Sequence, residues 1–477
     1  MSSKRLLIIH GRLIDPSQRL DEKRDILLEN GRVKSILKPD SLKAKTIDAE
    51  TFNAQGLWVV PGLIDMHVHF REPGGEDDET LETGALSALK GGVTTVLAMP
   101  NTHPPLDSVK ILNWLQNKSE KIKAPNVFFA AAITKRLEGR VLSDFKRLKD
   151  GGVLAFTDDG RPVMDSAIMR RALERCQKIG SFIISHCEDL NLSLGRPLNE
   201  GLSAFQKGIP GSPWASETSM VSRDLILAEL TGSHVHIAHV SAAASVEIIR
   251  QAKKRGIAVT AEAAPHHFVL SEEDIPGKDP NFKMNPPLRA VQDVLAVQEG
   301  LRDGTLDAIA TDHAPHQKSK KAKGILGAPF GVIGLETSLG LALTHLVHKK
   351  ILSPTRLVER MSLRPAQILG LRNKGTLKIG SDGDITLVDP RQCLIITNDL
   401  FIPSCPDWTR RPLMIGFPPR RNFLLVFRFF NRWPRFCGAK ESRPFLVPMF
   451  LASILKTQSG LPPALTKTGD FFAFSRN

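Results

Sequence analysis

The most restrictive feature of this sequence is a series of short apolar segments, rich in β-branched residues, that alternate with stretches of helical periodicity from Pro61 onward. In chain order they read VTTVLAMP, NVFFAAAI, GVLAFTDD, SFIISHCED, HVHIAHVS, GIAVTAEAAPHH and LDAIATDHAPH. Strands that alternate with helices form crossover units and a parallel sheet. Seven or eight units over about 310 residues favour a closed (β/α)8 barrel over an open sheet, and no Gly-x-Gly-x-x-Gly follows the first strand.

Two alternating apolar runs, LLIIHGRLID and DILLENGRVKSIL, precede this series and are typical of β-strands. The second contains Asn30-Gly31, a dipeptide that readily adopts the positive φ angles of a two-residue hairpin turn. The sequence therefore predicts a small β-domain next to the barrel.

Composition and cysteine usage bear on the cellular location of the protein. The 477 residues contain no run near the roughly 18 apolar residues that span a bilayer, which argues against an integral membrane protein. Only four apolar residues precede His10, fewer than the roughly 7 to 15 of a signal peptide. The five cysteines are odd in number and lack paired spacing. We expect a cytoplasmic protein with reduced thiols.

The net charge of +14 is concentrated near one end of the chain. Residues 401–477 hold 12 Lys and Arg against three acidic residues, together with 12 of the 23 Phe and no periodic apolar pattern. We therefore expect no nucleic-acid partner, and we interpret this atypical segment as frameshifted or disordered. The alternative is a basic aromatic segment around RNFLLVFRFFNRWPR that binds an acidic membrane surface.

Side chains that can bind metals stand at the ends of the predicted strands. They are His67 and His69, Asp158 and Asp159, His186, His239, and Asp312 with His313. All strands of a parallel barrel end on one face, so these residues are expected to converge. Residues i and i+2 of a strand share a face, which lets the His67-His69 pair point at one metal. Mixed imidazole and carboxylate ligands in a binuclear site favour Zn²⁺ over Mn²⁺, Co²⁺ or Fe²⁺, and over Mg²⁺ alone.

Two segments, DMHVHFREP and ATDHAPHQKSKK, resemble the signature sequences of dihydroorotases. MPNTHPPLDS, FTDDGRPVMDS, HCED, HIAHVS, APHHF, NPPLR and APFGVIGLET follow the family's order, and the likeness covers residues 5–395. It is specific to the bacterial long-chain type of the amidohydrolase superfamily. It implies a TIM-type metal-dependent hydrolase barrel over residues 61–371 and a small composite β-domain from residues 1–60 and 372–400.

The resemblance also implies roles for individual residues. The implied metal ligands are His67, His69, Asp159, His186, His239 and Asp312. The first histidine pair would bind one Zn²⁺ and the second pair another, bridged by Asp159 where many relatives have a carboxylated lysine. Asp312 would also be the catalytic residue that transfers the proton. The implied substrate contacts are His69, Arg71, Asn101, Asn285, His316, Phe330 and Gly331.

The implied reaction is the reversible hydrolysis of the cyclic amide of dihydroorotate to N-carbamoyl-aspartate, in pyrimidine (UMP) biosynthesis. Arg71 follows the metal histidines by two residues, so it can face the same cavity and bind the carboxylate of dihydroorotate through its planar guanidinium. Two alternatives stay open. One is a hydantoinase or allantoinase-like enzyme, whose substrates lack that carboxylate. The other is a non-catalytic partner of aspartate transcarbamoylase, and a homodimer is a further expectation.

Other charged groups near the predicted site have simpler explanations. We expect Glu188 and Asp189 to lie in a solvated loop rather than to orient metal ligands. The lysine run between Lys318 and Lys323 is also expected to be a solvated loop. The alternative for this run is a mobile basic loop that steers or covers an anionic substrate.

Overall fold

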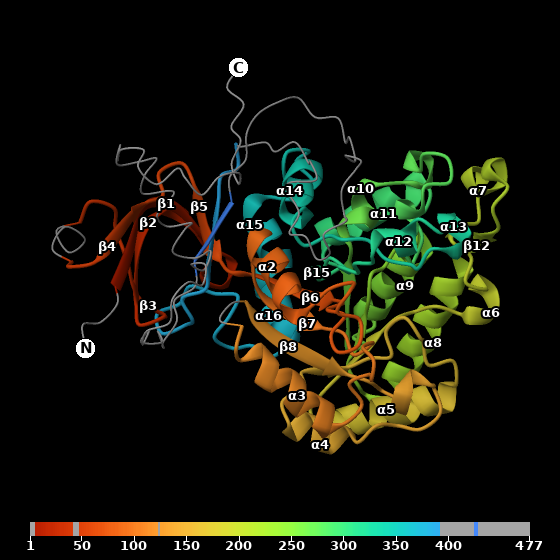
Figure 1. Cartoon of the computed structure of the whole chain (residues 1–477). Coiled ribbons are helices and arrows are strands. Elements are labelled where there is room, and N and C mark those ends of the chain that lie inside the picture. The colour runs from red at the N-terminus through yellow and green to blue at the C-terminus, as the bar shows by residue number, and fades with distance from the viewer. Residues whose placement is uncertain (1–4, 42–46, 123–124, 392–423, 428–477) are drawn as a thin grey trace. The chain divides into compact units, whose positions relative to one another are not determined.

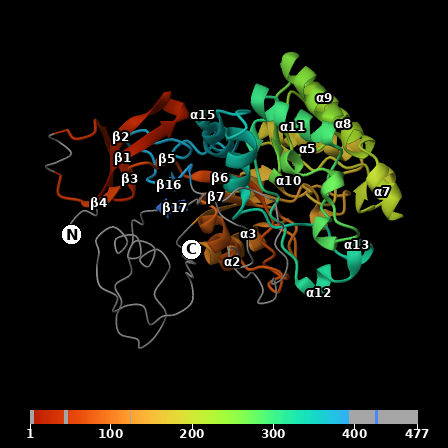
Figure 2. The same ribbon diagram turned by 90° about the horizontal axis from the view of Figure 1, so that it is seen from above.

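The computed structural model describes residues 5–41, 47–122, 125–391 and 424–427. By internal contacts the chain falls into two units, Met1–Phe430 and Asn431–Asn477, and the second lies wholly outside the described residues. The first unit contains a helix-covered barrel and a separate β-sheet (Figure 1). Viewed from above, the sheet and the barrel stand side by side within this unit (Figure 2).

Eight parallel strands form the barrel in sequential order. Their bounds are β6 Leu63–Val68, β7 Val93–Ala98, β8 Asn126–Ala131, β9 Ala155–Phe156, β10 Ile183–Ser185, β13 Val235–Ile237, β14 Val259–Ala263 and β15 Ala308–Ile309. The ends of the sheet meet, because the His69 amide donates to the His313 carbonyl at 2.8 Å and Val68 forms a parallel bridge to His313. Both β6 and β7 are buried at every position, as strands covered on both faces must be. The predicted (β/α)8 barrel is confirmed.

One main helix follows each barrel strand. These helices are α2 Leu81–Lys90, α3 Val109–Ser119, α4 Phe145–Asp150, α5 Ser166–Lys178, α8 Ala215–Thr231, α9 Ala243–Lys254, α11 Val291–Asp303 and α14 Ser338–Ala342. In α5 the buried residues Ile168, Ala172 and Cys176 recur every four positions and form one apolar face, and Asp165 caps the first turn by accepting from two backbone amides. Among the described residues, no helix has both the length and the apolar character needed to cross a bilayer.

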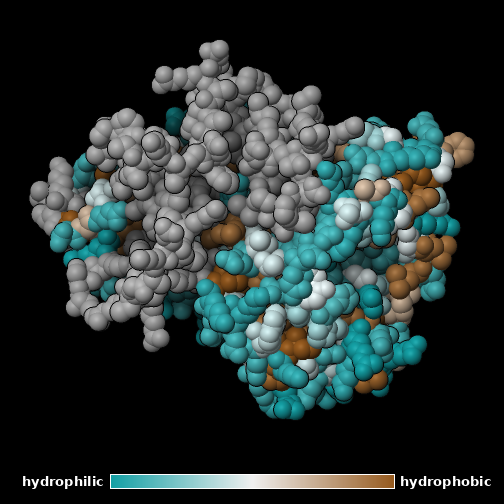
Figure 3. All heavy atoms as spheres, viewed as in Figure 1, coloured by the Kyte–Doolittle hydropathy of each residue, from teal (hydrophilic) through white to brown (hydrophobic). Residues whose placement is uncertain are grey.

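Short elements lie in the connections of the barrel and of the separate sheet. They are α6 Leu190–Ser193, β11 Leu198–Asn199, α7 Leu202–Lys207, β12 Gly211–Ser212, α10 Pro265–Val269, α12 Lys318–Lys321, α13 Gly324–Gly327, α15 Pro354–Val358, α16 Arg364–Ile368, and the single turns η1 Pro16–Gln18, η2 Lys135–Leu137, η3 Glu272–Asp274, η4 Pro280–Phe282, η5 Leu343–Val347 and η6 Glu359–Leu363. Hydrophobic residues gather on the surface near α6 and α7, where Phe205 is 83% exposed (Figure 3). Exposed apolar groups of this kind are typical of contact surfaces.

The separate sheet joins N-terminal strands to a strand that follows the barrel, in the order β17-β16-β5-β1-β2-β3, with β4 paired to β1. Its bounds are β1 Arg5–Asp15, β2 Leu20–Glu29, β3 Arg32–Leu37, β4 Glu50–Asn53, β5 Trp58–Pro61, β16 Ile385–Val388 and β17 Leu424–Phe427. The turn between β2 and β3 has positive φ at Asn30 (50°) and Gly31 (78°), which confirms the predicted hairpin.

The predicted boundaries of the composite β-domain, at residues 60 and 372, stay predictions. Within the segment 401–477, interpreted as frameshifted or disordered, the backbone of β17 pairs antiparallel with β16. The rest of that segment, including most of RNFLLVFRFFNRWPR, lies outside the described residues.

Candidate metal centre

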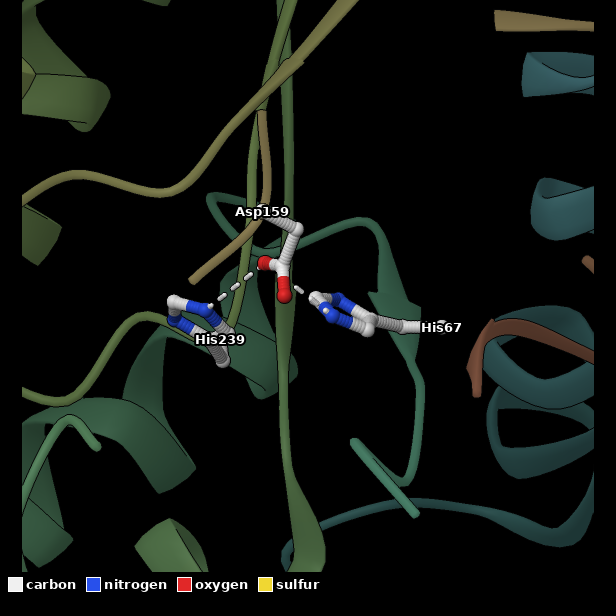
Figure 4. Close-up of side chains that lie close together, drawn as sticks. All are labelled: His67, Asp159 and His239. Carbon is white, nitrogen blue, oxygen red and sulfur yellow. Dashed lines mark ion pairs between the residues drawn. The ribbon is translucent and has the colours of Figure 1, made fainter. Parts of the chain in front are cut away.

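The carboxyl ends of four barrel strands bring five predicted ligands together. Ligand atoms of His67, Asp159 and His239 lie within 4.8 Å of one another, and so do those of His67, His69 and Asp312. All five side chains are buried. Figure 4 shows the Asp159 carboxylate between the rings of His67 and His239. His67 is shared by the two groups, so they form one continuous cluster.

The two aspartates each face more than one imidazole. The Asp159 carboxylate has Oδ1 at 3.3 Å from His67 Nε2 and at 3.6 Å from His239 Nε2, and Oδ2 at 3.3 Å from His69 Nε2. Asp312 Oδ1 lies 3.0 Å from His69 Nε2 and 3.6 Å from His67 Nε2. Asp159 therefore occupies a central position, and Asp312 lies beside the His67-His69 pair.

His186, the sixth predicted ligand, lies next to this cluster without belonging to either group of three. Its Nδ1 is 2.9 Å from His239 Nε2 and 3.4 Å from Asp159 Oδ1. Two imidazole nitrogens at this distance either share one proton or face a common cation. His186 and His239 therefore lie together next to Asp159 Oδ1.

Opposite charges decide the protonation of this buried cluster. Burial disfavours a charged His67, but Asp159 and Glu262 outweigh it and hold the His67 pKa well above its ordinary value. Burial likewise disfavours charged carboxylates, yet the surrounding histidines hold the pKa of Asp159 and of Asp312 well below the ordinary value. Both aspartates are therefore ionised at neutral pH, and the cluster attracts positive charge.

The donor atoms fit divalent cations. His67 Nδ1 lies 2.7 Å from Glu262 Oε1, and with that nitrogen as the donor Nε2 points into the cluster, where a bound cation would replace its proton. Within the part of the chain that the structure describes, His67 Nε2 and Asp159 Oδ1 are buried without a hydrogen-bond partner. Buried polar atoms are rarely left unpaired, and imidazole with carboxylate is a common donor set for Zn²⁺ and related metals. The two clusters are consistent with a binuclear metal centre.

Two carboxylates orient the ligands: Glu262, which the sequence analysis missed, and Glu188, for which it preferred another explanation. Glu262, inside β14, contacts His67 and also lies 3.1 Å from His236 Nε2. The sequence did contain a signal for Glu262, because an acidic residue within the apolar run VTAEAA is expected to be buried and paired. Glu188 is 7% exposed, lies 3.1 Å from His186 Nε2 and accepts from Asn285 Nδ2 at 2.8 Å. The expectation that Glu188 lies in a solvated loop was wrong.

The backbone at two cluster residues is unusual. His239 has φ of 31° and Asp312 has φ of 51°, in the left-handed region that non-glycine residues seldom adopt. Each such residue costs about 1–3 kcal/mol and persists only where its surroundings enforce it.

Asp158, which the sequence placed at the same strand end as Asp159, takes no part in the two groups described above. Its carboxylate accepts from the Thr134 amide at 3.0 Å instead.

Several predicted substrate residues lie at the same end of the barrel as the metal cluster, the barrel mouth. Arg71 Nε donates to the Pro315 carbonyl at 3.2 Å, and its Nη2 lies 3.3 Å from His316 Nε2. His316 Nε2 in turn lies 2.7 Å from the Phe330 carbonyl. Gly331 directly follows in the same loop, and its φ of 137° is one that a side chain would disfavour.

Asn101 joins the metal cluster to an open cavity. Its Oδ1 lies 2.8 Å from His69 Nδ1, which leaves His69 Nε2 to face the aspartates. A cavity of about 190 Å³ adjoins this point and is lined by Asn101, Asp159 and Arg161 among others. A small molecule could therefore reach the metal cluster through this cavity, which Arg161 borders.

Comparisons with known proteins agree with this geometry. Residues 56–245 match the family described as "Dihydro-orotase-like". The dihydroorotase of Geotalea daltonii is 49% identical over 386 residues, which cover 81% of this chain and 90% of that protein. The dihydroorotase of Syntrophus aciditrophicus is 46% identical over 392 residues, covering 82% and 91%. Among solved structures, the L-hydantoinase of Arthrobacter aurescens has a TM-score of 0.73 at 27% identity, covering 84% of this chain and 90% of that one.

Proposed function

Because the chain belongs to the dihydroorotase family, we propose that it hydrolyses the cyclic amide of dihydroorotate to N-carbamoyl-aspartate, and closes the ring in the reverse direction during pyrimidine biosynthesis. The observation that carries this proposal is a buried His and Asp cluster that shares one barrel mouth with a partly buried arginine, Arg71. The cluster supports hydrolysis of an amide, and the arginine supports recognition of an anionic substrate.

We propose Zn²⁺ as the metal, two ions per subunit, held by the His67-His69 pair, the His186-His239 pair and the two aspartates. Divalent cations bound there would lower the pKa of water from about 15.7 to about 7 and polarise the amide carbonyl. Asp159 would be shared between the two positions, since its Oδ1 lies 3.3 Å from His67 Nε2 of one pair and 3.6 Å from His239 Nε2 of the other.

Asp312 would move the proton. The neighbouring histidines keep its carboxylate ionised, and the contact of Oδ1 with His69 Nε2 at 3.0 Å fixes its orientation. An ionised carboxylate so placed can accept the proton of the attacking water and deliver it to the leaving ring nitrogen. In ring closure the same group takes the proton from the nitrogen, as microscopic reversibility requires.

Arg71 would hold the substrate carboxylate. Burial lowers its pKa, but a guanidinium remains protonated at neutral pH, and two of its nitrogens are already oriented by Pro315 and His316. A carboxylate can accept two parallel hydrogen bonds from it. Hydantoins and dihydropyrimidines lack this carboxylate, so Arg71 favours dihydroorotate over the substrates of the hydantoinases that share the fold.

Association with a second copy or with aspartate transcarbamoylase stays a prediction from the family resemblance, and so does a cytoplasmic location. The experiment that tests the function compares turnover of dihydroorotate and dihydrouracil by the full chain, alongside its metal content by plasma emission. We expect about two metal ions per chain and a strong preference for dihydroorotate. Equal turnover of both compounds would favour a hydantoinase-like enzyme, and metal-free inactive protein would contradict the proposal.

A further inference from the structure

One lysine of the run between Lys318 and Lys323 lies inside the protein. Lys321, the last residue of α12, is 4% exposed, whereas Lys318 and Lys323 are exposed. The expectation of a solvated loop was wrong at this position. Burial of an ammonium group is costly unless its N–H groups find acceptors, so the position of Lys321 requires an explanation.

The Lys321 ammonium donates to three backbone carbonyls. Its Nζ lies 3.1 Å from the carbonyl oxygens of Pro280, Lys283 and Pro329. An ammonium has three N–H donors, so all of them are used. The three acceptors lie outside α12, in the segment that begins with η4 and in the loop that follows α13. One side chain therefore joins three separate pieces of the barrel mouth.

These pieces carry three of the seven predicted substrate contacts. Asn285 lies two residues after Lys283, and Phe330 directly follows Pro329. The Gly331 amide donates to the same Lys283 carbonyl at 3.0 Å, so this oxygen accepts from both Lys321 and Gly331.

A second cation reinforces the same junction. Lys283 Nζ donates to the Leu326 carbonyl at 3.0 Å and lies 4.5 Å from the centre of the Phe330 ring. On the other side of α12, Lys320 donates to Asp78 at 2.6 Å, and Asp78 lies 3.7 Å from His316 Nδ1. The loops are thus fixed to each other and to His316.

We propose that Lys321 is a positioning residue, which holds the loops of Asn285, His316 and Phe330-Gly331 at the spacing that the anionic substrate requires. This inference rests on the proposed function. Lys321 would act through these loops and not through contact with the substrate, because its three N–H groups are used by backbone carbonyls. Its removal takes a shared donor from three carbonyls. Those of Pro280 and Lys283 keep a backbone amide donor each, whereas the Pro329 carbonyl loses the Lys321 donor, which favours rearrangement of its loop.

The test compares Lys321→Met with Lys323→Met, a matched control two residues away on the surface. Each full-length variant is purified with Zn²⁺, and its metal content, kcat and KM are measured with dihydroorotate and with dihydrouracil. In Lys321→Met we expect the KM for dihydroorotate to rise about tenfold or more, as for the loss of a charged hydrogen bond. We expect kcat, dihydrouracil turnover and metal content to stay near wild type. The control should match wild type throughout.

Three results would overturn the proposal. Wild-type values of kcat/KM with both substrates would show that Lys321 does not position the anion-binding side. A parallel loss for both substrates indicates a general structural role. Loss of bound metal in Lys321→Met would show that Lys321 acts on the metal cluster instead. Where Lys321→Met does not fold, Lys321→Gln is measured in the same way, with the same outcomes.

Hydrogen exchange separates this inference from the proposed function. If the wild-type chain turns over neither substrate, the proposed function fails, but exchange at residues 280–286 and 314–331 still reports on the loops. Faster exchange there in Lys321→Met, and not in Lys323→Met, supports the positioning role. Equal exchange in both variants contradicts it.

Discussion

The metal side and the substrate side of the barrel mouth are built in different ways. The residues of the two metal groups lie in strands or within three residues of a strand end, as His67 does in β6 and Asp312 does after β15. The substrate residues His316 and Phe330 lie in longer loops that are fixed by side-chain hydrogen bonds to backbone carbonyls. Sheet hydrogen bonds therefore set the spacing of the metal ligands, and loop contacts set the positions of His316 and Phe330, so the two can be altered separately.

The largest effect is expected from Asp312→Asn on the metal side. The amide keeps the shape of the carboxylate but cannot accept the proton, so kcat should fall by about 10²–10⁴-fold. Steady-state kinetics with dihydroorotate measure this, and Asp150→Asn on the exposed end of α4 is the control. A kcat within a few-fold of wild type would assign the proton transfer to another group.

The next effect concerns a residue that orients a ligand. In Glu262→Gln the side chain no longer draws the proton of His67 Nδ1 toward a negative charge, so metal affinity should fall by about 10–100-fold. Titration of metal-free protein with Zn²⁺ measures the affinity. Recovery of activity at high Zn²⁺ would show that the site itself survives, and unchanged affinity would contradict the role of Glu262.

On the substrate side, Arg71→Lys should raise the KM for dihydroorotate by about tenfold, because a bidentate guanidinium is replaced by a point charge that makes fewer oriented bonds. Metal content should not change. The same KM measured with dihydrouracil serves as the internal control. A variant that loses metal together with substrate affinity would show that the two sides are not separable.

The smallest effect on activity is expected far from the mouth. Leu387 in β16 is 1% exposed, and its replacement by Ala should lower the free energy of unfolding by about 2–5 kcal/mol through the cavity it leaves. The values of kcat and KM well below the unfolding temperature should equal those of wild type. Denaturant unfolding and kinetics on the same sample test both statements, and a changed KM would mean that the separate sheet influences the loops.

The alternation of strands and helices predicted the barrel, and the rule that parallel strands end on one face predicted the meeting of His67, Asp159 and His239. Both depend on local periodicity, which a sequence displays directly. Strand alternation after His67 and His69 allowed Arg71 to face the same cavity, whereas Asn285 rested on the family resemblance alone, because no local pattern fixes the direction of its loop. Lys321 was misjudged for a related reason: its acceptor Pro280 lies 41 positions away, and no local pattern reveals such a contact.

The left-handed backbone at His239 and Asp312 has a consequence for engineering of this chain. Glycine would relax both positions and raise thermal resistance, yet it would delete an imidazole and a carboxylate from the centre. A screen that selects only for heat tolerance should therefore enrich glycine substitutions at these two positions, which would give stable but inactive proteins. Selection for durability and selection for turnover will diverge there first.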